Sequence, residues 1–202
     1  MPKREELENG TGYLFYELSM LFHARIIHTA ASKKQEQGPS AEHNAMWNAV
    51  QCCAIEAFLL HYRNLYEFFW NIDKSPKNDK DSLLAEQYAP GWSGEAEWQK
   101  DAPPDEQSRI NKLLSHISFR RDDLGPGKWP LLQMEQRVCR VFRQFITQVT
   151  DGEAMFSRAM AVYKARTDAL TKPLTAVHGI GDASTTSVTQ VAWWGFELDL
   201  WK

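Results

Sequence analysis

Residues 41–71, AEHNAMWNAVQCCAIEAFLLHYRNLYEFFWN, contain the most regular apolar pattern in the chain and decide its fold class. Apolar side chains recur there at steps of three and four, which places them on one face of an α-helix. That face consists of Met46, Val50, Cys53, Ala54, Ala57, His61, Leu65 and Phe68. The segment therefore predicts a helix of about eight turns, with this face turned toward the core.

A second helix is predicted on the N-terminal side, at 12–31, where GYLFYELSMLFHARIIHTAA is rich in apolar residues. The polar segment that follows contains Gly38-Pro39, a turn signal that also stops a helix. Ser40 then stands at the N-cap position of the helix over 41–71, and Glu42 in the first turn complements the helix dipole. Two consecutive helices with a turn between them are expected.

On the C-terminal side, a short helix over 81–89 precedes a loop that runs to Pro104 and contains Trp92 and Trp98. Side chains this large and apolar are rarely left in water, so the loop is expected to pack on the helices. Further helices are predicted over 105–121 and 131–150. The stretch 153–170 is either a fifth, shorter helix or a continuation past Gly152.

The helix over 131–150 has a clear apolar face and a basic one. Its apolar face comprises Leu131, Met134, Val138, Val141, Phe142, Phe145 and Val149. Arg137, Arg140 and Arg143 are placed around the other side. The chain is therefore predicted to be all-α, an up-and-down helical bundle of four to five helices over 1–172, followed by an irregular aromatic C-terminal tail over 173–202.

The tail combines a small, polar, glycine-containing stretch with the apolar end VAWWGFELDLWK. Three placements are open for it. It packs on its own bundle, adds a strand through SVTQV, or binds a partner chain. Docking on its own bundle is the commonest outcome for an apolar terminal segment.

Composition narrows the function classes. The 202 residues are 43% hydrophobic and 24% charged, as in ordinary globular proteins, and the net charge of −3 attracts neither nucleic acid nor anionic lipid without a local basic patch. MPKREELENGTG does not resemble a signal peptide, and no apolar run approaches the ~20 residues that span a bilayer. A cytoplasmic protein without membrane contact is expected, and the three cysteines predict buried thiols rather than disulfides or a zinc site.

Common catalytic motifs are missing from the sequence, so no cofactor and no metal are expected. The candidate binding residues on the helix over 41–71 are His61, Arg63 and Asn64. His61 lies on the core-facing row, where a histidine and an asparagine are usually satisfied by each other or by a neighbouring helix. Arg63 forms a row with Glu56 and Glu67 at steps of seven and four, which is typical of solvated ion pairs but also lets Arg63 reach into a pocket.

On the helix over 105–121, Arg109, His116 and Arg120 follow steps of seven and four and share one face. Two arginines and a histidine on one face are suited to holding a phosphate, because arginine forks onto phosphate oxygens and histidine exchanges protons near neutral pH. The same residues are also suited to pairing with the carboxylates of Glu56 or Glu67.

The segments EAFLLHYRNLYEFF and RINKLLSHISFRR resemble a group of uncharacterised bacterial helical proteins and, more distantly, the HEPN superfamily of helical bundles. The resemblance covers about 40–150. The resemblance implies a homodimer and a role in bacterial defence. Some members are metal-independent ribonucleases, and their active motif is an arginine followed by a polar residue, with four to six residues between the arginine and a histidine. Arg63-Asn64 has no such histidine; Arg109 and His116 fit the spacing, although Ile110 stands at the polar position. By this resemblance Arg109 is the phosphate binder and His116 the general base or acid.

Three functions follow as hypotheses. The first is a non-catalytic bundle that acts by protein association, as a homodimer or through its C-terminal tail, in a bacterial defence or stress module. The second is a HEPN-like metal-independent ribonuclease that acts on RNA with Arg109 and His116, joined across a dimer by His61, Arg63 and Asn64. The third is a small-ligand pocket between the helices over 41–71 and 105–121, lined by His61, Tyr62, Asn64 and tryptophan side chains.

Overall fold

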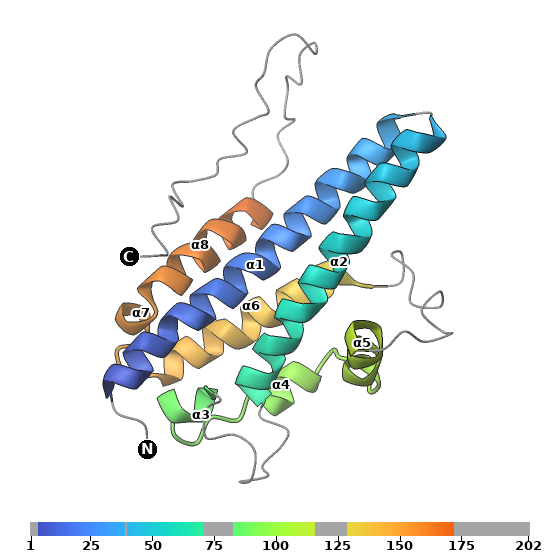
Figure 1. The fold of residues 1–202 in the computed structure, drawn as a ribbon. Coiled ribbons are helices and arrows are strands. Elements are labelled where there is room, and N and C mark those ends of the chain that lie inside the picture. The colour runs from blue at the N-terminus through green and yellow to red at the C-terminus, as the bar shows by residue number, and fades with distance from the viewer. Residues whose placement is uncertain (1–3, 39, 71–82, 116–128, 172–202) are drawn as a thin grey trace. The chain divides into compact units, whose positions relative to one another are not determined.

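The computed structural model describes residues 4–38, 40–70, 83–115 and 129–171. Every regular element in these ranges is an α-helix, which confirms the all-α prediction for the described part of the chain. In chain order (Figure 1) they are α1 (Arg4–Gln37), α2 (Ala41–Trp70), α3 (Ala85–Tyr88), α4 (Glu95–Gln99), α5 (Glu106–Ser115), α6 (Leu131–Gln148), α7 (Gly152–Met155) and α8 (Ser157–Thr171). The chain divides into two compact units, 1–167 and 168–202, and the contacts below lie within the first. The predicted tail over 173–202 lies outside the described residues.

Helices α1 and α2 form a long antiparallel hairpin (Figure 1). α2 covers almost the whole predicted range, and the backbone N–H of His43 donates to Ser40 Oγ at 3.1 Å, so the predicted N-cap is confirmed. α1 is longer than predicted at both ends. Its added turns are rich in Glu, Lys and Gln, which favour helix without contributing to an apolar pattern.

Helix α6 crosses behind this hairpin in Figure 1 and contacts both of its helices. The predicted apolar face of α6 is fully confirmed, because all of its residues are buried. Phe145 lies at the centre of an aromatic cluster, with ring centroids within 6.2 Å of those of Phe68, Phe69, Tyr88, Trp92 and Phe156. The core of the first unit therefore lies between the hairpin and α6.

The segment over 90–104 packs on the helices, as its tryptophans predicted, but it is not a loop throughout, because Glu95–Gln99 form α4. Trp98, on α4, is completely buried against Tyr62, Tyr66 and Phe69 of α2. Trp92 is half-buried, and its indole N–H donates to the carbonyl oxygen of Phe69 at 2.8 Å. This segment thus closes one end of the core.

The chain after α6 forms separate helices rather than a continuation past Gly152. Asp151 adopts a left-handed φ of 55°, and a Cβ at Gly152 would lie 2.4 Å from the carbonyl oxygen of Ile146. Because only glycine permits that approach, the chain turns here and resumes as α7 and α8.

Three predictions from helical periodicity are wrong. Met46 and Cys53, expected in the core, are exposed, while Phe58 and Tyr62 of α2 are buried instead. Arg137, predicted to lie on the side away from the apolar face of α6, is 2% exposed. The buried-thiol prediction is correct for Cys139 and wrong for Cys53, and Cys52 is intermediate. The core face of α2 is rotated from the predicted one, since its buried residues include Ile55, Phe58, Leu59, Tyr62 and Tyr66, which lie outside the predicted row.

Candidate functional site

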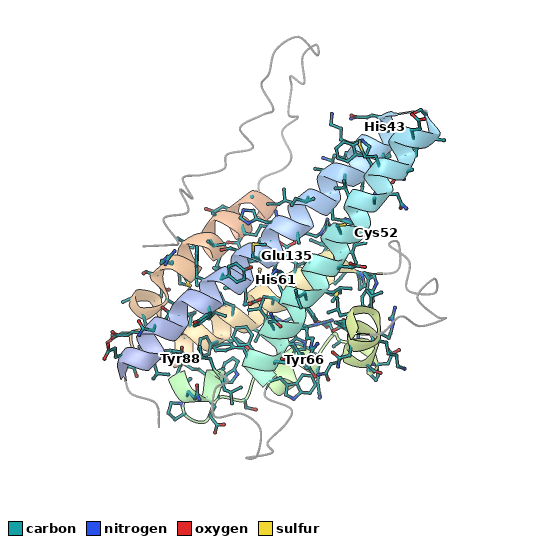
Figure 2. All side chains as sticks on the ribbon, in the orientation of Figure 1. His43, Cys52, His61, Tyr66, Tyr88 and Glu135 are labelled. Atoms are coloured by element: carbon teal, nitrogen blue, oxygen red, sulfur yellow. The ribbon has the colours of Figure 1, made fainter. Side chains whose placement is uncertain are left out.

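The predicted residues His61 and Asn64 are held by a carboxylate of α1. His61 Nδ1 lies 2.7 Å from Glu17 Oε2, and the Asn64 amide donates to the same oxygen at 3.1 Å. His61 is buried between α1 and α2 (Figure 2), with the Tyr16 ring edge-on to it at 5.6 Å between centroids. The three polar groups therefore join the two helices of the hairpin.

A cleft of about 130 Å³ opens beside this cluster. Its walls come from both helices and from the segment before α3, namely Gly10, Tyr13, Leu14, Glu17, Asn64, Leu65, Phe68 and Leu83. Small-molecule sites usually enclose about 300 Å³ or more. The cleft is thus too small for a typical metabolite.

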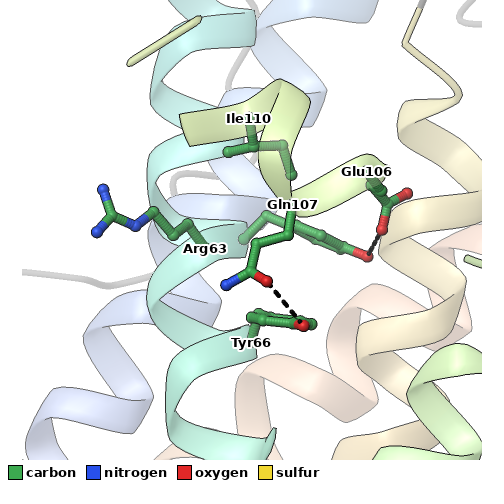
Figure 3. A pocket seen from close by; sticks show the side chains of 6 residues that line it. Arg63, Tyr66, Glu106, Gln107 and Ile110 are labelled. Atoms are coloured by element: carbon green, nitrogen blue, oxygen red, sulfur yellow. Dashed lines mark hydrogen bonds between the residues drawn. The ribbon is translucent and has the colours of Figure 1, made fainter. Parts of the chain in front are cut away.

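A pocket between α2 and α5, lined by Tyr62 but not by the predicted His61 and Asn64, is smaller still, at about 10 Å³, which is room for about one water. Gln107 of α5 lines this pocket, and its side chain points toward Tyr66 (Figure 3), whose hydroxyl donates to the Gln107 amide oxygen at 3.1 Å. The Arg63 guanidinium points away from Glu106 and pairs at 2.7 Å with Glu67, one turn along α2. The described residues of α2 and α5 leave no room for a small ligand between them.

Arg109 stacks on an aromatic ring. Its Cζ lies 4.9 Å from the centroid of the Trp129 ring, just before α6. His116 and Arg120 lie outside the described residues, so the convergence of these groups with Arg109 on a phosphate stays a prediction. Ribonuclease activity remains a hypothesis as well, because its predicted general base or acid, His116, lies outside the described residues.

A buried ionic network between α2, α5 and α6 was not predicted from the sequence. Arg137 of α6 pairs with Glu106 of α5 at 2.7 Å, and both are buried. The Tyr62 hydroxyl donates to the same Glu106 oxygen at 2.8 Å and accepts a hydrogen bond from Arg137. Burial and the Glu106 charge raise the pKa of Tyr62 well above its ordinary value, so the phenol stays protonated. The sequence spacing does indicate that Arg137 is buried. Arg137 follows Met134 by three residues and precedes Val141 by four, which places it on the apolar face of α6.

A second buried carboxylate, Glu135, connects α6 to α8 and α1. Both of its oxygens accept hydrogen bonds from Arg166, and Arg25 Nε lies 3.9 Å from Oε2. Burial, with the Glu135 charge as a smaller contribution, raises the pKa of the neighbouring Cys139 thiol to about 12. Both buried carboxylates thus have arginine partners, as structural ion pairs do.

Five of the six large apolar side chains that are exposed in the described residues lie on one side of the hairpin, and the sixth, Leu132, lies on α6. We call this surface the outer face; its largest exposed members are Tyr13 (69%), Tyr16 (45%), Ile27 (47%), Met46 (53%) and Leu60 (45%). Met20, His23, Val50, Cys53 and Ala57 occupy the intervening positions. It contains four of the eight residues in the α2 row that the sequence assigned to the core, namely Met46, Val50, Cys53 and Ala57.

The outer face lies on the opposite side of the hairpin from the core. Residues two apart on a helix are about 200° apart around it. Leu60 lies between the buried Phe58 and Tyr62, and Tyr16 lies between the buried Leu14 and Leu18. Because Tyr16 also contacts His61 of α2, the exposed rows of the two helices adjoin and form one surface.

The described residues contain no group of three or more histidine, cysteine or acidic side chains placed to hold a metal ion. In the same part of the chain, none of the helices combines the length and apolar character needed to cross a membrane. Comparison with known proteins finds no matching family model, no matching curated protein and no matching solved structure.

Proposed function

We propose that this chain is an association module, an up-and-down helical bundle whose outer face binds another protein chain. The observation that carries the proposal is the outer face itself, with five large apolar side chains at least 45% exposed on two adjoining helices. Single exposed apolar residues are ordinary on protein surfaces, but contiguous patches usually mark an interaction site.

The polar candidates support association rather than chemistry. His61 and Asn64 share the Glu17 carboxylate, Arg63 pairs with Glu67, and Arg109 lies over Trp129. Each of these side chains thus makes a contact that joins two elements of the fold or two turns of one helix. The HEPN resemblance supports a role for this association module in bacterial defence or stress responses, in the cytoplasm.

Photo-cross-linking in living cells tests the proposal. A benzophenone amino acid at Tyr16 replaces one exposed aromatic ring with another on the outer face. The control carries the same group at Leu132, which is 38% exposed on α6 and does not belong to the outer face. We expect protein adducts of higher mass from Tyr16 and none, or far fewer, from Leu132.

The identity of the adduct decides the outcome. An intermolecular adduct through Tyr16 supports the association module, whichever chain it contains. Cross-links confined to the same molecule, for example to 173–202, would mean that the outer face is covered internally and would overturn the proposal. The absence of any adduct at Tyr16 beyond the Leu132 level would overturn it as well.

A further inference from the structure

We infer that the partner of the outer face is a second copy of this chain, with the two hairpins packed face to face as four helices. The inference rests on the proposed function and names its partner. It commits to a two-fold symmetric contact in which the same surface is used by both copies.

The spacing of the outer face fits helix-on-helix packing. On α1 the positions Tyr13, Met20 and Ile27 are seven residues apart, and Tyr16 and His23 repeat the same step. On α2 the rows are Met46, Cys53 and Leu60, and Val50 with Ala57. A seven-residue repeat keeps one row of a helix facing a partner helix along its length. The surface that matches two antiparallel rows of this kind is another pair of antiparallel helices with the same repeat, which this chain itself supplies.

The absence of charged residues on the outer face favours a second copy of this chain over a strongly charged partner. The ten positions of the outer face contain no Asp, Glu, Lys or Arg. Its one titratable imidazole, His23, is half-buried, and burial lowers its pKa, which favours the neutral ring. Two copies therefore meet without burying like charges, whereas an acidic or basic partner would find no opposite charge on this surface.

The outer face is large enough for a small interface between two helix pairs. His43 Nε2 lies 2.8 Å from the Lys34 carbonyl oxygen, so the Met46 end of α2 lies near the end of α1. At 1.5 Å per residue, the rows from Tyr13 to Ile27 and from Met46 to Leu60 are each about 21 Å long, and each helix is about 10 Å wide. The resulting area, on the order of 400 Å², is about half of the roughly 800 Å² that each partner buries in a standard complex, which fits a dimer that forms reversibly with concentration.

Sedimentation velocity of the full chain tests the inference. We expect the wild-type protein to sediment as a species of twice the 23.3 kDa chain mass. Leu60→Glu places a charge in the contact and should raise the dimer Kd about 30-fold or more. Leu132→Glu makes the same chemical change on α6 and should leave the dimer intact.

Two controls keep the result interpretable. Leu60 is 45% exposed, so the Leu60→Glu chain should keep its helical circular dichroism and its thermal midpoint at low concentration. Ile27→Lys, on the other helix of the outer face and of opposite charge, should weaken the dimer in the same way. Loss of the dimer in both variants, with folding retained, supports the inference.

Other outcomes overturn it. A wild-type chain that stays monomeric at about 100 µM, well above the Kd of ordinary homodimers, excludes the second copy as partner. A dimer that survives both outer-face variants and dissociates in Leu132→Glu places the contact elsewhere. If the chain is monomeric but Tyr16 cross-links to a different protein in cells, the association module stands and only its partner changes. If neither a dimer nor a cross-link forms, both proposals fail.

Discussion

Arg137→Ala should reduce the free energy of unfolding by about 3–5 kcal/mol, the usual effect of removing one partner of a buried ion pair. The guanidinium is 2% exposed and pairs with Glu106, which is itself buried. It also donates to the Asp101 carbonyl oxygen at 2.6 Å. Its loss leaves a carboxylate in the core without its countercharge. Chemical denaturation followed by circular dichroism measures the change.

Two further variants separate charge from packing. Arg63→Ala breaks the half-exposed pair with Glu67 and should cost less than about 1 kcal/mol. Combining Glu106→Gln with Arg137→Met removes both buried charges and keeps a partner for the Tyr62 hydroxyl, so it should cost less than Arg137→Met alone. Equal losses in the single and double variants would show that Arg137 contributes by packing and not through its charge.

Trp98→Ala should cost about 3–5 kcal/mol, the usual range for removing a large aromatic side chain from a core. The indole is completely buried and contacts the rings of Tyr62, Tyr66 and Phe69. Its removal opens a cavity where α4 meets α2. Denaturation monitored by circular dichroism is the suitable measurement, because the substitution also removes a fluorophore.

Trp98→Phe is the matched control. The Trp98 indole N–H is buried and makes no hydrogen bond in the described residues, so phenylalanine loses ring volume but no polar contact. We expect a loss of about 1–2 kcal/mol. A Trp98→Phe variant as unstable as Trp98→Ala would contradict this account of the site.

The sequence predicted those parts of the fold that depend on one helix at a time. The apolar face of α6 from Leu131 to Val149 and the Ser40 cap at the start of α2 follow from local spacing and local hydrogen bonding. Burial of Trp98 followed from its size. Each of these features depends on one residue or on residues close together in the chain, so a single sequence is enough to predict it.

The errors concern residues whose surroundings come from several elements. Arg137 was placed with Arg140 and Arg143 on the side away from the apolar face because it is charged, but it is buried with Glu106, which is 31 residues away in the chain. Met46 and Cys53 were assigned to the core because they are apolar and regularly spaced. The regular spacing identified an apolar row correctly, but a row that faces another chain has the same pattern as one that faces the core.

The candidate site was only partly predictable for a similar reason. His61 and Asn64 were selected from their position on α2, yet their shared partner is Glu17, 44 and 47 residues earlier. The outer face was visible in the sequence as an apolar row. Its exposure depended on which sides of α2 are contacted by α1, α5 and α6, and local periodicity does not contain that choice.

The most direct test of the outer face as an association surface is the alkylation rate of Cys53, measured in a Cys52→Ser chain so that the label reports Cys53 alone. Cys139, with a pKa of about 12, stays unreactive while the protein is folded and serves as the internal reference. We predict that Cys53, exposed on the isolated chain, reacts more slowly as protein concentration rises and in cells, and that Leu60→Glu restores fast reaction. A Cys53 rate that is the same at every concentration, in cells and in the Leu60→Glu chain would contradict the account.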